Sequence, residues 1–266
     1  MRISVVLPIY DETDSVRDIV RELHQLIPDR LHQVVLVLAP KSSEASFAVA
    51  RELMAAYPGT ELHVQQRVPG VGFAYREGYE HVTGTHVLMM DSDGEMQPET
   101  VPRLIEAMER TGADVVIGAR WAEGGGATNY PPLKYVLNRT YQLLFRGLLL
   151  TRLADLTFGF KLLRREVVDE IDWTAQFQDI GAETTMYPLR LGYKVVQVPT
   201  VWRGRATVSQ HSLSLARNLL YVRAAARALL HPRRLRKEGA PRGPGSGGGA
   251  NGRASAADSA PSGRDP

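Results

Sequence analysis

The chain has 266 residues, room for one large domain or two small ones, and its 44% hydrophobic content is ordinary for a globular protein. It contains no cysteine, which excludes disulfides and thiolate metal sites and fits a reducing compartment. The net charge of +3 is too small to indicate a nucleic-acid partner, although positive charge gathers toward the C-terminus.

The sequence gives no sign of export or of a membrane span. Residues 1–10 read as a strand ending at Pro8, without the basic and apolar regions of a signal peptide. Apolar runs such as Leu143–Leu150 are interrupted by Arg146 and are too short to cross a bilayer. We therefore expect a cytoplasmic protein, either free or peripheral on the cytoplasmic face of the membrane.

The first half of the chain alternates strand and helix patterns. Continuous apolar strands are expected at Ile3–Leu7, Val34–Leu38, Glu61–Gln65, Val87–Met90 and Asp114–Gly118. Helices are expected between them, over Ser15–Leu26, up to Tyr57, from Gly70 through Val82, and over Glu99–Arg110. Short connections and continuous apolar strands indicate an α/β fold, a mostly parallel sheet with helices on both faces.

The second half is less regular. A flexible loop at Glu123–Gly126 precedes helix patterns over Pro131–Leu150 and within Gln176–Leu191, and a strand is expected at Lys194–Val198. Leu213–Leu230 is a basic amphipathic helix that either lies on an anionic membrane or packs its leucines on the domain. We predict one domain over 1–211, this helix over 212–232, and a disordered Gly/Pro/Ser/Arg-rich tail over 233–266.

Two carboxylates directly follow the fourth strand. Asp91 and Asp93 stand at the carboxyl end of an apolar run, where open α/β sheets bind ligands. Mg²⁺ prefers oxygen ligands, commonly one or two carboxylates plus substrate phosphates. The spacing therefore predicts a metal-diphosphate site, and the alternative is an acidic cap on the helix that starts near Pro98.

Other polar residues allow a functional or a structural interpretation. Arg120 follows a strand and either pairs with phosphate or forms a surface ion pair. The segment with Asp155, Thr157 and Lys161 is either a wall of the site or an ordinary turn. The segment Gly70-Val-Gly72 either binds phosphate or is a tight turn that needs the backbone freedom of glycine. Glu183, one turn after Asp179, is either a general base or part of a solvated helix face.

Short motifs follow one another in a fixed order along residues 3–205. They are Val5-Val-Leu-Pro-Ile-Tyr-Asp-Glu12, Arg67 with Gly70-Val-Gly-Phe-Ala-Tyr75, Met90-Asp-Ser-Asp93, Val115-Val-Ile-Gly-Ala-Arg120, Asp155-Leu-Thr-Phe-Gly-Phe-Lys161 and Gly192-Tyr-Lys-Val-Val-Gln-Val-Pro199. As an ordered set they resemble inverting nucleotide-sugar glycosyltransferases of family 2, in particular the polyprenyl-phosphate (dolichyl-phosphate) mannose or glucose synthases. The resemblance implies a GT-A-type, Rossmann-like fold.

The resemblance also implies roles for individual residues. Asp91 and Asp93 would hold Mg²⁺ or Mn²⁺ on the donor diphosphate, with Glu95 near the metal. Arg120 would face phosphate, and Asp155 with Thr157 would line the sugar and acceptor side. The candidate catalytic residues are Asp93, Arg120, Asp155 and Glu183, and the other candidate substrate contacts are Pro8, Tyr10, Glu12, Lys41, Arg67, Gly72, Asp91, Thr157, Lys134 and Arg205.

The chain departs from the family pattern at the nucleoside and acceptor ends of the site. Ala39-Pro-Lys-Ser42 stands where the family carries Asp-Asp-Gly-Ser, so GDP and UDP donors both stay open. Tyr130-Pro131 stands where the synthases carry Trp-Pro, with Lys134 and Asn138 in place of an Arg and a Ser. The segment before the last helix is reduced to Gly204–His211.

We therefore expect a metal-dependent inverting hexosyltransferase that uses a nucleotide-diphosphate sugar and a lipid-phosphate acceptor at the cytoplasmic membrane face. A phosphate acceptor is already anionic near neutral pH and needs no protein base. Two alternatives stay open. One is transfer to a hydroxyl acceptor, such as a glycan, with Asp179 or Glu183 as base. The other is a non-catalytic nucleotide-sugar-binding or regulatory protein on the same fold.

Overall fold

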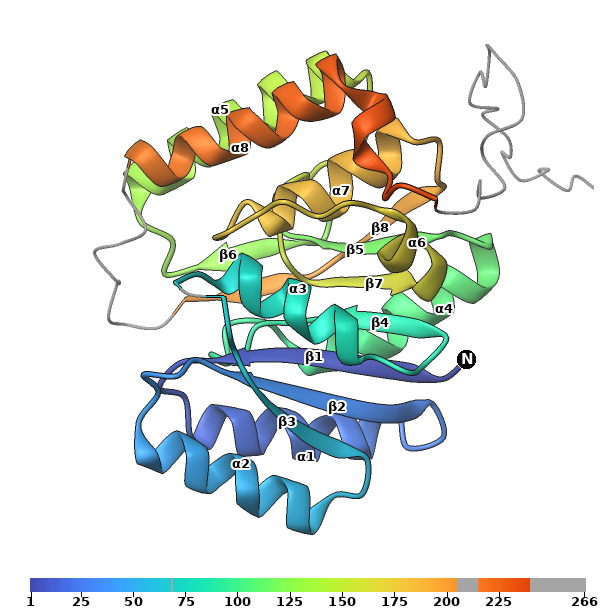
Figure 1. The fold of residues 1–266 in the computed structure, drawn as a ribbon. Coiled ribbons are helices and arrows are strands. Elements are labelled where there is room, and N and C mark those ends of the chain that lie inside the picture. Colours follow the sequence, from blue (N-terminus) through green and yellow to red (C-terminus); the bar gives the residue numbers. More distant parts are fainter. Residues whose placement is uncertain (68, 205–214, 240–266) are drawn as a thin grey trace, which may run out of the picture.

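A seven-stranded sheet with strand order β3-β2-β1-β4-β7-β5-β8 forms the centre of the molecule (Figure 1). The structure is a computed structural model that describes residues 1–67, 69–204 and 215–239. Four strands at one side of the sheet run parallel: β1 (Ile3–Ile9), β2 (Leu31–Leu38), β3 (Thr60–Val64) and β4 (His86–Met89). Their carboxyl ends therefore meet at one edge.

One strand runs against the others. β7 (Lys161–Arg164) lies antiparallel between β4 and β5 (Val115–Ala119), and β8 (Val195–Pro199) pairs with β5 in parallel. A separate pair, β6 (Gly126–Thr128) and β9 (Val201–Arg203), begins inside the segment that we expected to be a flexible loop. The expected α/β architecture, mostly parallel with helices on both faces, is confirmed.

The alternation of side chains along each strand supplies two separate apolar cores. Val5 and Leu7 face the core that is covered by α1 (Asp14–Leu26), α2 (Glu44–Ala56) and α4 (Val101–Thr111). Val6 and Val87 face the second core, on the opposite side of the sheet, which is covered by α3 (Val71–His81), α6 (Arg165–Glu170) and α7 (Ile180–Arg190). Burial on both sides explains why these strands read as continuous apolar runs.

Two further helices form an outer layer on the α7 side of the sheet (Figure 1). α5 (Pro132–Leu149) and α8 (Leu215–Leu230) contact each other, and α8 also packs on α7. The buried alanines Ala224, Ala225 and Ala228 allow α8 to lie close to the second core. No helix in the described part of the chain is long and apolar enough to cross a membrane.

The C-terminal boundary differs from the prediction. Disorder was expected from residue 233, but Pro232–Leu235 form the short 3-10 helix η3. Leu235 is buried in the second core, and Arg236 pairs with Glu170 and forms a bridge to Ile171. An apolar side chain and a paired arginine therefore hold this segment on the domain despite its basic composition. Arg205 and the tail beyond residue 239 lie outside the described residues.

Candidate functional site

The two aspartates lie where the order of the strands reverses. The chain runs outward from β1 to β3 and then returns to β4 on the other side of β1. Ser92 joins the two strand ends, because its hydroxyl donates to the carbonyl of Pro8. The hydroxyl of Ser15 at the start of α1 donates to the Ser92 carbonyl over 2.8 Å. This is the crevice in which open α/β sheets bind ligands.

Asp91 is fixed by a tyrosine that our sequence interpretation did not assign. The buried Tyr75 of α3 donates its hydroxyl to Asp91 Oδ1 over 2.7 Å. Burial and the adjacent Asp93 charge raise the pKa of Asp91 to about 7. Burial also raises the pKa of Tyr75, with the Asp91 charge adding to it, so the phenol stays protonated and acts as the donor. Tyr75 thus fixes one of the two carboxylate oxygens of Asp91.

The capping alternative does not hold. η1 (Pro98–Thr100) starts after Gln97 and has no side-chain cap, and α4 likewise has none. Asp93 Oδ1 instead accepts the backbone N–H of Glu95 over 3.0 Å, across a turn in which Gly94 has φ 78°. This turn keeps Asp93 close to Asp91 rather than on a helix.

The donor set fits a hard divalent cation in part. Asp91 and Asp93 are half-buried carboxylates one residue apart, and two such oxygens suit Mg²⁺ or Mn²⁺ when substrate phosphates complete the shell. Within residues 1–67, 69–204 and 215–239, however, no group of three His, Cys, Asp or Glu side chains is arranged to hold a metal. The predicted three-carboxylate set of Asp91, Asp93 and Glu95 is therefore not formed among these residues.

Arg120 and Asp155, which were predicted as separate candidate residues, form one buried unit. Arg120 donates to both oxygens of Asp155, over 2.7 and 3.0 Å, and its guanidinium lies 4.3 Å from the ring centre of Phe158. Gln142 of α5 donates to Asp155 and to Thr157 over 3.2 and 2.9 Å. Asp155 is fully buried in this unit, and its predicted place on the sugar and acceptor side of the site stays a prediction.

This unit ties α5 to the sheet. Arg120 follows β5, while the loop that carries Asp155 and Thr157 leads into β7. Burial opposes the charged form, but Asp155 raises the pKa of Arg120 above its usual value. The Arg120 guanidinium is thus engaged by a carboxylate, and its predicted contact with phosphate stays a prediction.

The loops after β1 and β2 carry the residues that were predicted to contact the nucleoside. Glu12 accepts the backbone N–H groups of Tyr10 and Asp11, and Asp11 accepts that of Ser43 over 3.0 Å. Tyr10 is 57% exposed, and Lys41 is also exposed in a turn. The two acids thus shape the loops, while the tyrosine ring and the lysine remain accessible to a ligand.

Arg67 is anchored by acids on α3. Its side chain pairs with Glu77 and Glu80, and Glu77 also accepts the backbone N–H groups of Gln66 and Arg67. Burial opposes ionisation of Glu77, but these hydrogen bonds and one from His63 lower its pKa to about 2. Glu77 therefore holds the chain between β3 and α3 in place.

Gly72 has a packing role, and its predicted substrate contact stays a prediction. A Cβ atom there would lie 2.7 Å from the backbone of Gln176, and the Gly72 N–H donates to the Gln176 carbonyl. At Gly70, with φ 134°, a Cβ would lie 1.9 Å from the same carbonyl. The glycines permit the start of α3 to touch the loop before α7, which places Tyr75 beside Asp91.

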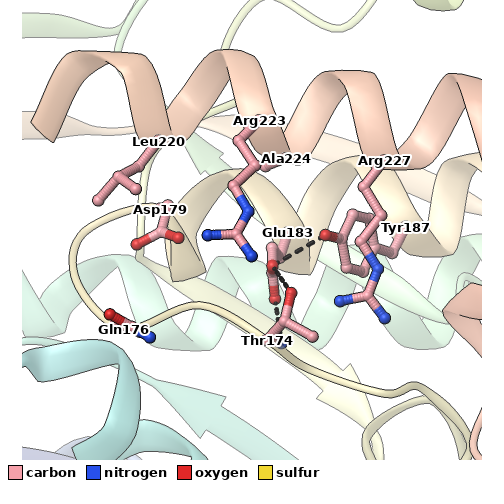
Figure 2. Close-up of a pocket in the computed structure, with 9 residues that line it drawn as sticks. All are labelled: Thr174, Gln176, Asp179, Glu183, Tyr187, Leu220, Arg223, Ala224 and Arg227. Atoms are coloured by element: carbon pink, nitrogen blue, oxygen red, sulfur yellow. Dashed lines mark hydrogen bonds between the residues drawn. The ribbon is translucent and has the colours of Figure 1, made fainter. Parts of the chain in front are cut away.

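Glu183 and Asp179, the candidate bases, also shape this loop (Figure 2). Glu183 accepts the N–H and hydroxyl of Thr174, the N–H of Ala175 and the hydroxyl of Tyr187. Asp179 accepts the N–H of Phe177 over 2.8 Å. Both are buried, and Figure 2 shows the Arg223 guanidinium of α8 between their carboxylates. Their hydrogen bonds fit loop positioning better than proton abstraction.

Two lysines lie near the aspartates. The Lys134 ammonium of α5 lies 5.2 Å and 5.4 Å from the ring centres of Tyr130 and Trp202, and burial lowers its pKa. Lys161 is fully buried at the start of β7, where it donates to the Gly181 carbonyl and to Thr184. Burial lowers the pKa of Lys161 to about 7. Lys134 is the cation that remains half-exposed beside the site.

Comparisons with known proteins agree with this geometry. The model of glycosyl transferase family 2 matches residues 4–172. The chain is 34% identical over 229 residues to polyprenol monophosphomannose synthase of Mycolicibacterium smegmatis, covering 83% of this chain and 84% of that one. It is 32% identical over 205 residues to undecaprenyl-phosphate mannosyltransferase of Micrococcus luteus, covering 75% and 82%.

A solved structure shares the fold at low identity. Glucosyl-3-phosphoglycerate synthase of Mycobacterium tuberculosis, crystallised with Mn²⁺, UDP-glucose and phosphoglyceric acid, gives a TM-score of 0.62 at 17% identity. The match covers 90% of this chain and 81% of that one. At this identity the likeness shows the GT-A fold alone.

Proposed function

The chain belongs to glycosyl transferase family 2 and is a glycosyltransferase, and we propose that it moves a hexose from a nucleotide-diphosphate sugar to a lipid phosphate. The observation that carries the proposal is the pair Asp91 and Asp93 at the strand reversal, held by Ser92 and Tyr75. The named activities of the Mycolicibacterium and Micrococcus relatives support a polyprenyl-phosphate acceptor.

In this proposal Asp91 and Asp93 hold Mg²⁺ or Mn²⁺ against the donor diphosphate. Once bound, the ion would neutralise charge that develops on the leaving diphosphate. The exposed Tyr10 ring and Lys41 lie at the strand ends where the nucleoside would bind, whether it is guanosine or uridine. Lys134, against two aromatic rings and near Asp93 and Glu95, is positioned for an anionic acceptor group.

The burial and the hydrogen bonds of the two candidate bases support a phosphate acceptor. Glu183 and Asp179 are buried and accept hydrogen bonds within the loop before α7. A phosphate oxygen is anionic near pH 7 and attacks without deprotonation, whereas a hydroxyl acceptor needs a base. Direct attack in a single displacement would invert the anomeric centre.

Binding and transfer assays test the two halves separately. Titration of the full chain with Mn²⁺ and either GDP or UDP should give binding that Asp91→Ala weakens strongly. Glu52→Ala, at an exposed position on α2, serves as a matched acidic control. If neither nucleotide binds in a manner that depends on Asp91, the metal-diphosphate proposal fails. If donor is consumed only with a glycan acceptor, the lipid-phosphate proposal fails while the donor site stands.

A further inference from the structure

The large apolar side chains that remain exposed gather on two helices. Among the described residues, all except Tyr10 and Met54 lie on α5, directly after it, or on α8. Tyr10 lies in the loop after β1, and Met54 lies on α2. The group on the two helices comprises Leu133, Tyr135, Val136, Leu143, Leu144, Leu148, Leu150, Leu219, Val222 and Leu230. α5 and α8 lie side by side in the outer layer (Figure 1).

The exposed residues of α5 form a stripe opposite its buried side. Gln142 and Phe145 point inward, toward Asp155 and the second core. Val136 and Leu143, seven residues apart, lie on the opposite side, and both are about 60% exposed (59% and 64%). A helix at the surface of a water-soluble domain normally places polar residues there. α5 is therefore apolar on the side that faces away from the fold.

Leu150 adds an independent observation. It ends α5 in the left-handed conformation, with φ 51°, and is 93% exposed. Glycine or asparagine is favoured at such a helix end, because a β-carbon there costs roughly 1–2 kcal/mol. A strained, fully exposed leucine gives no advantage to a fold surrounded by water. It gives one if its side chain enters an apolar phase.

The charge carried by the two helices and the segments that directly follow them has one sign. From Pro132 to Arg152, and again from Leu215 to Lys237, the chain contains Lys and Arg but no Asp or Glu. Arg152, Arg233 and Arg234 are exposed. A basic border attracts anionic lipid head groups. It also opposes self-association, because an isologous contact would bring two positive surfaces together.

We propose that α5 and α8, with Leu150 at the end of α5, form a docking face for an anionic lipid bilayer. The inference rests on the proposed lipid-phosphate acceptor and deepens it. α5 also carries Gln142 and Lys134, so the element that meets the bilayer contacts the Arg120–Asp155 unit and the proposed acceptor site. Docking would thus bring a phosphate at the bilayer surface to the site without a membrane-spanning helix among the described residues.

Vesicle flotation of the full chain tests the docking face. We expect binding to vesicles of phosphatidylcholine with phosphatidylglycerol and weak binding to phosphatidylcholine alone. The double variant Leu143→Gln, Leu148→Gln should bind these vesicles with an affinity at least about tenfold lower than that of the unaltered chain. Met54→Gln, an exposed control on α2, should bind like the unaltered chain. Equal flotation of the double variant and the control would overturn the proposal.

Leu150→Gly separates docking from folding. Glycine removes the strain at φ 51°, so the melting temperature should stay equal or rise, whereas vesicle binding should fall several-fold. A fall in melting temperature with unchanged flotation would mean that Leu150 serves the fold and would overturn its docking role. Sedimentation completes the test: if the unaltered chain dimerises and Leu143→Gln, Leu148→Gln abolishes the dimer, the occupant is a second copy instead of a bilayer.

A soluble acceptor distinguishes failure of docking from failure of the proposed function. With a short, water-soluble isoprenyl phosphate the double variant should retain activity, and with acceptor embedded in vesicles it should lose activity. Loss with both acceptors would contradict a role limited to docking. Absence of transfer by the unaltered chain with either acceptor would refute the proposed function, while flotation would still report the docking face.

Discussion

The hydrogen bond from Tyr75 to Asp91 gives the sharpest prediction about the metal site. Tyr75→Phe removes one hydroxyl from a side chain that is 1% exposed and leaves the packed ring in place. A hydrogen bond to a charged group is worth about 1.5–3 kcal/mol, and partners behind a metal ligand commonly change metal affinity about 10- to 100-fold. We expect a loss of that size in Mn²⁺-dependent nucleotide binding, since Asp91 loses its fixed orientation.

Tyr79→Phe is the matched control for this prediction. Tyr79 lies one turn further along α3, is 5% exposed, and its hydroxyl contacts Met89 Sδ at 3.3 Å instead of a carboxylate. Calorimetric titration with Mn²⁺ and nucleotide, paired with a melting curve, measures both effects. If the two variants bind nucleotide equally well, or if Tyr75→Phe lowers only the melting temperature, Tyr75 supports the fold and does not orient Asp91.

Three further variants test the supporting structure. Glu77→Gln should lower the free energy of unfolding at pH 7 by about 1–3 kcal/mol. Because the pKa of Glu77 is depressed to about 2 in the folded protein, this difference from the unaltered chain should shrink as pH falls from about 4.5 toward 2. Urea unfolding at several pH values measures both effects. Asp155→Asn should cost about 3–5 kcal/mol in the same experiment at pH 7, because the buried Arg120 guanidinium loses its anionic partner; a loss under about 1 kcal/mol would contradict this. Gly72→Ala should lower the melting temperature, since its Cβ would lie 2.7 Å from backbone, whereas Gly147→Ala, with open space around it, should not.

Most of the fold could be predicted from the sequence, because strands that are buried on both faces appear as continuous apolar runs. The strands at Ile3–Leu7 and Val34–Leu38 were predicted within two or three residues of their observed bounds. β7 was not predicted, since its direction depends on pairing with β4 and β5 and not on a local period. The ordered 3-10 helix at Pro232–Leu235 was also not predicted, because the basic composition of this segment gives no indication that Leu235 is buried.

The candidate site was predictable only where a motif fixes position along the chain. Asp91 and Asp93 follow a strand end, so their place at the edge of the sheet could be expected. The pairing of Arg120 with Asp155 joins the end of β5 to the loop before β7, and Tyr75 reaches Asp91 only because two glycines allow a close approach. Such contacts depend on three-dimensional packing that leaves no periodic pattern in the sequence.

The proposed activity is tested most directly by transfer of a radiolabelled hexose to polyprenyl phosphate. The full chain would be assayed with GDP- and UDP-linked hexoses and Mn²⁺, in parallel with Asp91→Asn, Asp93→Asn and the exposed control Glu52→Gln. We expect labelled lipid from the unaltered chain and from the control with at least one donor, and almost none from either aspartate variant. Equal lipid labelling by all four proteins, or no labelling by any of them, would contradict the proposed activity.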